Sequence, residues 1–80
     1  MRRRAIKIKI LNPKQVVYEG DAESVFLPGD HGEFEILDYH VPVVSLLSGG
    51  DVIVDWKRRI PIRNGMVKFD RNECVVLMEE

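Results

Sequence analysis

The stretch GDHGEFEILDYH, residues 29–40, gathers most of the side chains that could do chemistry in this chain. It holds both histidines, His31 and His40, together with four carboxylates. Neutral imidazole and carboxylate groups are common ligands of zinc and common proton carriers in catalysis. The stretch is therefore a candidate metal site, a candidate catalytic site, or a surface that another protein contacts.

A metal site would need these ligands to converge. If residues 31–36 were extended, His31, Glu33 and Glu35 would share one face, and His40 could fold back to join them. A zinc site requires three or four convergent ligands and supporting hydrogen bonds, whereas the glycines on both sides of His31 indicate a loop. We therefore expect no metal and no cofactor, and a metal-binding domain using His31, Glu33 and His40 stays as a minor alternative.

Catalysis would need a carboxyl group with a raised pKa, which requires burial or a like-charged neighbour. The candidates are Asp30, Glu33, Glu35 and Asp38. A chain of 80 residues forms one small, thin domain, spanning residues 1–80, with little depth for such a pocket. The sequence also has no Ser-His-Asp arrangement and no phosphate-cradling glycine loop, so we expect that the protein is not an enzyme.

The charge balance argues against nucleic acid as a partner. Twelve basic and thirteen acidic side chains give a formal charge of −1, which provides no overall field to attract a polyanion. The two basic clusters, Arg2-Arg3-Arg4 and Lys57-Arg58-Arg59, are interpreted as solvated strand ends and turns. A small nucleic-acid-binding β-barrel remains the main alternative function.

Such a barrel would present exposed aromatic side chains among basic ones. The alternation pattern places Phe26, Trp56 and Phe69 on inward positions, which leaves Tyr18 and Tyr39 as the available platforms.

Cys74 and the apolar segments of the sequence bear on disulfide formation, secretion and membrane insertion. Cys74 is the single cysteine, so it cannot form an internal disulfide, and its apolar surroundings in residues 74–78 predict a small buried side chain. Lysines alternate with isoleucines in AIKIKI, which is not the pattern of a signal peptide. No stretch approaches the roughly 20 apolar residues of a spanning helix, so we expect any membrane association to be peripheral.

The dominant hydrophobic period is two, which is the period of a β-strand. Ile6, Ile8 and Ile10 alternate with Lys7 and Lys9, and further short apolar segments follow between Gly, Pro, Asn and Asp turn signals. Short strands at this spacing predict an all-β fold, a flattened β-sandwich or barrel of about ten short strands.

The pair Asn64-Gly65 predicts a β-hairpin with a two-residue type I′ turn, because both residues tolerate positive φ. That register puts four apolar side chains on one face of the hairpin: Ile60, Ile62, Val67 and Phe69. Pro61 cannot donate to a ladder, so its strand is predicted to lie at a sheet edge or to be bulged there. A turn over residues 70–73 leads into a last strand, residues 74–78.

Three segments carry a family resemblance: VYEGDAESV, PGDHGEFEIL and HVPVV, in this order and spacing. With them, nearly the whole chain resembles the N-terminal β-domain of the epsilon subunit of F-type rotary ATP synthases, called delta in mitochondria. The resemblance implies a flattened ten-strand sandwich that is not a catalyst. It also implies a rotor subunit at the foot of the central stalk that binds the gamma subunit and the c-ring and helps couple ion translocation to ATP synthesis.

Site residues follow from the matching motifs. The resemblance implies that one loop meets the c-ring, with Glu33 as the acidic partner of a basic side chain; its residues are Asp30, His31, Gly32, Glu33 and Phe34. It implies that Asn12, His40 and Ser45 lie on one side of the domain and face the gamma subunit. The expected location is peripheral, on the cytoplasmic face of the bacterial inner membrane, with membrane contact only through the complex.

The sequence departs from the family pattern at three places. Glu35 stands where the family usually has Gly, and Asp38-Tyr39 stands where it usually has Pro-Gly, so the loop is more acidic. The hairpin near WKRR is shorter than usual. Most members continue into two C-terminal helices that inhibit ATP hydrolysis and bind ATP in some members. This sequence stops at Glu79-Glu80, so we expect neither that inhibition nor nucleotide binding.

Overall fold

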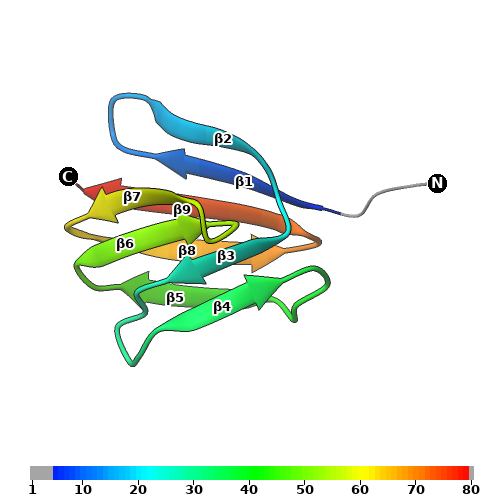
Figure 1. Ribbon diagram of the computed structural model, residues 1–80. Helices are drawn as coiled ribbons and strands as arrows, with labels where there is room; N and C mark the ends of the chain where they lie inside the picture. Colours follow the sequence, from blue (N-terminus) through cyan, green and yellow to red (C-terminus); the bar gives the residue numbers. More distant parts are fainter. Residues whose placement is uncertain (1–4, 80) are drawn as a thin grey trace.

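The protein is a sandwich of two β-sheets, seen in a computed structural model that describes residues 5–79 (Figure 1). Within these residues the chain forms nine strands and no helix: β1 (Ile6–Leu11), β2 (Val16–Ala22), β3 (Ser24–Leu27), β4 (Phe34–Leu37), β5 (Val43–Leu47), β6 (Gly50–Val54), β7 (Arg58–Ile62), β8 (Asn64–Asp70) and β9 (Glu73–Glu79). The all-β sandwich is confirmed, with nine described strands where about ten were predicted. The Arg2-Arg3-Arg4 cluster and Glu80 lie outside the described residues.

One sheet has five strands in the order β2-β1-β9-β8-β5, and the other has four in the order β4-β3-β6-β7. β1 lies inside the larger sheet, where it pairs antiparallel with β2 and parallel with β9. Its alternation behaves as predicted, since Ile6, Ile8 and Ile10 are buried while Lys7 and Lys9 are exposed. The inner faces of both sheets meet in one core, which removes their apolar side chains from water.

Cys74 belongs to this core, as predicted. Burial among apolar side chains disfavours the thiolate and raises the pKa of Cys74 to about 12. Phe69, the inward aromatic side chain on β8, is also buried as predicted.

The predicted hairpin at Asn64-Gly65 is wrong. β7 pairs with β6 in the smaller sheet, whereas β8 pairs with β5 and β9 in the larger one, so the chain crosses between the sheets at Arg63. The four apolar side chains expected on one hairpin face are all buried, but they meet across the core from opposite sheets: Ile60, Ile62, Val67 and Phe69. A crossing and a hairpin give the same inward alternation, and alternation alone does not separate them.

Gly65 has a different role from the turn residue that was predicted. A Cβ at this position would lie 2.2 Å from the backbone oxygen of Leu77 on the paired strand β9. The close approach of two backbones excludes any larger residue there, which is a common reason for glycine inside a strand.

The left-handed turns lie elsewhere in the chain. Asp55 and Trp56 have φ values of 55° and 56° between β6 and β7, and the amide of Lys57 donates to the carbonyl of Val54 at 3.0 Å. Arg71 and Asn72 form the equivalent pair, with φ values of 52° and 59°, in the predicted turn between β8 and β9.

These turns correct two predicted aromatic positions. Trp56 is 58% exposed, because the left-handed turn ends the inward alternation of β6 at Val54. Phe26 is half-buried and lies on the outer face of β3, since its neighbours Val25 and Leu27 take the inward positions. The prediction that Pro61 lies on an edge strand is confirmed, because β7 ends the four-stranded sheet.

Candidate interaction surfaces

The loop of residues 28–33 has a firmly bonded base. The amide of Asp30 donates to the carbonyl of Leu46 at 2.9 Å, and the amide of Ser48 donates to the carbonyl of Pro28 at 2.8 Å. The hydroxyl of Ser48 also donates to Asp30 Oδ1 at 3.2 Å. These bonds join the end of β3 in one sheet to the end of β5 in the other.

The tip of this loop faces solvent. His31 and Glu33 are exposed, while Phe34 packs against the core and anchors the start of β4. Gly29 is required by close packing, because a Cβ there would lie 2.5 Å from the carbonyl oxygen of Gly32. The five residues predicted for the c-ring contact therefore form one compact loop that presents an imidazole and a carboxylate on a fixed base.

Asn12, His40 and Ser45 are all on or beside strands of the five-stranded sheet, but they do not form one cluster. Asn12 follows β1 at the end of the sheet that carries the loop of residues 28–33, and His40 precedes β5 at the opposite end. Ser45 lies within β5, opposite Val67.

The three side chains also differ in their surroundings. Asn12 Oδ1 accepts the amides of Lys14 and Gln15, both at 2.8 Å, which fixes the turn into β2. The ring of His40 packs edge-on against Phe69, with centroids 6.0 Å apart, and its Nδ1 lies 2.7 Å from the carbonyl oxygen of Val41. Asn12 and His40 thus have defined local roles besides any contact with a partner.

The Ser45 side chain turns toward the inner side of β5, where it is half-buried. Its hydroxyl donates to the carbonyl of Leu46 at 3.0 Å. The side chains on either side of Ser45 point the opposite way, and they are much more exposed: Val44 at 68% and Leu46 at 62%.

The outer face of the five-stranded sheet carries an apolar surface. The strand registers place four side chains in one row across β5, β8, β9 and β1, which we call the outer apolar row: Leu46, Met66, Leu77 and Leu11. In the neighbouring row Val44 and Val75 alternate with the exposed Lys68 and Lys9, in the order Val44, Lys68, Val75 and Lys9. A contiguous exposed apolar patch of this kind, with charged neighbours, is typical of a protein interface.

Sequence reasoning missed this surface, although a signal was present. The run VPVVSLL, residues 41–47, is apolar at consecutive positions, so both faces of β5 carry apolar side chains. An edge strand with only one face on the core should alternate, and its failure to alternate indicates that the second face is also covered by something.

The metal alternative finds no geometric support. Within residues 5–79, no group of three or more His, Cys, Asp and Glu side chains is arranged to hold a metal ion. His31 lies before β4 and His40 after it, so the whole strand, about 10 Å long at about 3.3 Å per residue, runs between them. In the same range, the structure has no helix that is long and apolar enough to cross a membrane.

Comparison with known families gives a match over almost the whole chain. Residues 5–80 match the family model of the ATP synthase delta/epsilon chain, β-sandwich domain. The chain belongs to this family. The family resemblance drawn from the three sequence segments is therefore confirmed.

Curated relatives of this delta/epsilon domain agree. The ATP synthase epsilon chain of Sulfurimonas denitrificans is 36% identical over 78 residues, which cover 92% of this chain and 60% of the relative. The ATP synthase epsilon chain of Prochlorococcus marinus is 34% identical over 77 residues, covering 92% of this chain and 58% of the relative. The chain thus spans 60% or less of the length of these relatives.

Solved structures show the same fold. A chain from the Euglena gracilis mitochondrial ATP synthase superimposes with a TM-score of 0.82 at 14% identity, covering 98% of this chain and 52% of that one. A chain from the central stalk/c-ring structure of the Tetrahymena thermophila mitochondrial ATP synthase gives 0.78 at 10% identity, covering 100% and 67%. At these identities the likeness establishes the delta/epsilon sandwich fold.

Proposed function

We propose that the chain is a non-catalytic central-stalk subunit of an F-type ATP synthase. It binds the gamma subunit and the c-ring, rotates with them, and helps couple ion translocation to ATP synthesis. The family match over residues 5–80 carries this proposal, and the outer apolar row supplies a surface suited to a stable partner. The proposed location is peripheral, on the cytoplasmic face of the bacterial inner membrane, through the complex.

The gamma subunit is proposed to cover the outer apolar row. Stable interfaces combine an apolar centre with a polar rim, and this face has both, since the row lies beside Lys9 and Lys68. Asn12 and His40 mark the two ends of the same sheet, and Ser45 lies on its edge strand. A partner that spans the outer face from end to end and also wraps over the β5 edge, where Ser45 turns inward, would contact all three predicted positions at the margin of one interface.

The c-ring is proposed to meet the loop of residues 28–33 together with Phe34. The exposed carboxylate of Glu33 is suited to pair with a basic side chain of a ring loop, and the bonds between Asp30, Leu46 and Ser48 hold the loop in place. A fixed loop loses little conformational freedom on binding, which favours a contact that must persist during rotation.

The gamma contact is tested by size-exclusion chromatography of the chain with the cognate gamma subunit. We expect co-elution at micromolar concentrations, and we expect Leu46→Lys to abolish it by placing a charge in the outer apolar row. Val17→Lys is the matched control, because Val17 is an exposed valine on β2 outside the row. The proposal fails if the unmodified chain does not co-elute, or if both lysine variants co-elute equally well.

The c-ring contact is tested in the assembled complex with Glu33→Gln, which removes the charge and keeps the shape of the side chain. We expect weaker coupling of proton pumping to ATP hydrolysis, with an unchanged unfolding midpoint of the isolated chain. Glu73→Gln, an equally exposed change at the opposite end of the sandwich, should leave coupling intact. A large loss of thermal stability in Glu33→Gln would instead make Glu33 a structural residue.

A further inference from the structure

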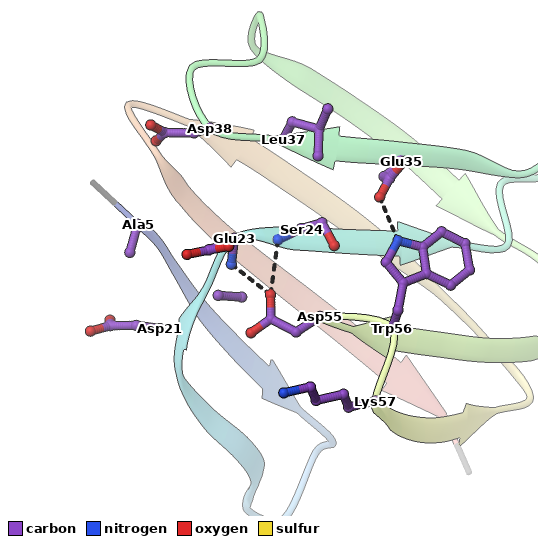
Figure 2. A pocket seen from close by; sticks show the side chains of 11 residues that line it. Ala5, Asp21, Glu23, Ser24, Glu35, Leu37, Asp38, Asp55, Trp56 and Lys57 are labelled. Carbon is purple, nitrogen blue, oxygen red and sulfur yellow. Dashed lines mark hydrogen bonds between the residues drawn. The ribbon is translucent and has the colours of Figure 1, made fainter. Parts of the chain in front are cut away.

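A hollow of about 1090 Å³ opens at the end of the sandwich away from the loop of residues 28–33 (Figure 2). β3 separates the two regions, because it begins at Ser24, which lines the hollow, and ends at Leu27, just before the loop. The hollow is open to solvent, and its volume lies slightly above the range of about 300–1,000 Å³ found for small-molecule sites. A segment of polypeptide suits it better than a small metabolite.

Trp56 forms one side of the hollow and is held firmly despite its exposure. Its indole Nε1 donates to Glu35 Oε2 at 2.8 Å, and its ring contacts Phe26 with centroids 5.1 Å apart. The left-handed conformation at Trp56 is unusual for such a bulky residue. The preceding Asp55 anchors this turn, because its Oδ1 accepts the amides of Glu23 and Ser24 at 2.7 and 3.1 Å.

An exposed tryptophan in a fixed orientation is a strong candidate for a binding contact. Tryptophan is among the residues that contribute most to protein interfaces, and a side chain ordered in advance loses little entropy when a partner binds. Leu37, which is also exposed, adds a second apolar surface to the lining.

The charge around the hollow selects the kind of partner. Among the described residues that line it, a single lysine, Lys57, faces five carboxylates: Asp21, Glu23, Glu35, Asp38 and Asp55. In Figure 2, Glu35 lies near the indole of Trp56, and Asp21 and Asp38 lie at the other side of the view. Acidic groups therefore extend across the opening from the aromatic side.

We propose that this hollow binds an arginine-bearing segment of a partner protein. The planar guanidinium stacks on Trp56 and donates to neighbouring carboxylates, a combination that an arginine fork makes better than the compact ammonium of lysine. This goes beyond the proposed function, because the hollow lies away from both the outer apolar row and the loop of residues 28–33.

The test uses the full isotope-labelled chain and a blocked peptide, Gly-Arg-Gly-Arg-Gly, followed by NMR. Trp56 is the single tryptophan, so its indole signal reports the hollow unambiguously. We expect saturable shifts of this signal and of the Ser24 and Asp55 amides, with a dissociation constant of about 0.1–1 mM. The same peptide with citrulline in place of arginine keeps the shape, lacks the charge, and should produce no such shifts.

Two neutralising variants identify the contacts. Glu35→Gln keeps an oxygen that accepts the indole hydrogen bond, and Asp21→Asn changes an exposed side chain, so both should fold normally. Each should weaken peptide binding about threefold to fivefold at low salt. Glu19→Gln, an exposed change on β2 outside the lining of the hollow, should leave binding unchanged.

Three results would overturn the proposal. The first is the absence of saturable shifts at about 10 mM peptide, and the second is equal binding of the citrulline peptide. The third is a shift of the Trp56 signal, with no peptide present, when Arg2→Ser, Arg3→Ser and Arg4→Ser are combined in one variant. We expect this variant to leave the signal unmoved. A shift there would mean that the occupant is the chain itself. None of these outcomes bears on the gamma or c-ring contacts, which are measured separately.

Discussion

Apolar side chains on the outer faces of the two sheets differ in how much of their surface is exposed to solvent. On the four-stranded sheet, Phe26 pairs with Ile53, which in turn pairs with Arg59. Ile53 lies outside the main core, yet it is only 6% exposed. The ring of Trp56 packs against Phe26, and Arg59 forms an ion pair with Asp51 at 3.3 Å. On this face, neighbouring side chains shield the apolar residues from solvent.

On the five-stranded sheet, none of the residues described (5–79) covers the outer face in this way. Leu46 and Val44 are more than half exposed, and Leu77 is nearly so. Apolar side chains on an outer face therefore do not by themselves mark a docking surface. The informative property is whether the neighbours on the same face already exclude water from them.

The largest expected effect compares one apolar residue from each face. Ile53→Ala should lower the free energy of unfolding by about 2–4 kcal/mol, because it leaves a cavity under Phe26 and Arg59. Leu46→Ala should change it by no more than about 0.5 kcal/mol, since the side chain is mostly in water already. Urea denaturation of both variants measures the difference, and equal losses would show that the two faces are packed alike.

A smaller effect is expected at the turn that carries the covering tryptophan. Asp55→Ala removes the acceptor of the Glu23 and Ser24 amides and should cost about 1–2 kcal/mol, as loss of a capping carboxylate does. Asp55→Asn keeps an acceptor oxygen and should recover most of this loss. The comparison would fail if the two variants were equally destabilised in the same urea experiment.

The inner face adds a pH dependence through its buried cysteine. Burial raises the pKa of Cys74 to about 12 from 9.0, so on a rise in pH the unfolded chain loses this proton first and is favoured. The contribution is complete below about pH 9 and is lost as the pH rises toward 12. From about pH 9 to about pH 10, the unfolding free energy should fall by about 1 kcal/mol more than that of Cys74→Ala. Parallel pH profiles would contradict a buried thiol.

The smallest effect concerns the orientation of Trp56. Glu35→Ala removes the acceptor of the indole N–H and should cost at most about 1 kcal/mol, because the bond is exposed to solvent. The fluorescence of the single tryptophan should nevertheless become less anisotropic and more accessible to a neutral quencher. Glu35→Gln retains an acceptor and should behave like the unmodified chain.

Much of the fold was predictable because a hydrophobic period of two indicates directly which side chains of a strand are buried. The alternating isoleucines of β1, the buried Cys74 and the edge position of Pro61 all followed from local rules. The connection between β7 and β8 could not be predicted in this way, because the pattern indicates which side chains point inward but not which sheet each strand joins. Local turn preference favoured a hairpin, and pairing of β8 with β5 and β9 overrode it.

The candidate surfaces were predictable only in part. The loop of residues 28–33 is contiguous in sequence, so its motif was visible. The outer apolar row joins four strands whose order is set by long-range pairing, so no local pattern could assemble it. Trp56 was misplaced because two consecutive left-handed residues, neither of them glycine, end the alternation without a sequence signal.

The parallel pairing of β1 with β9 has a consequence for how the molecule is made. The registers join Lys7 to Glu73 and Leu11 to Leu77, so the middle of the larger sheet depends on segments near the two ends of the described chain. On the ribosome, β1 has one neighbour to bond until β9 has been synthesised, and the isoleucines it contributes to the core stay in contact with water until then. Such long-range closure is slow, which makes the nascent chain dependent on completing β9 before it can hold any partner.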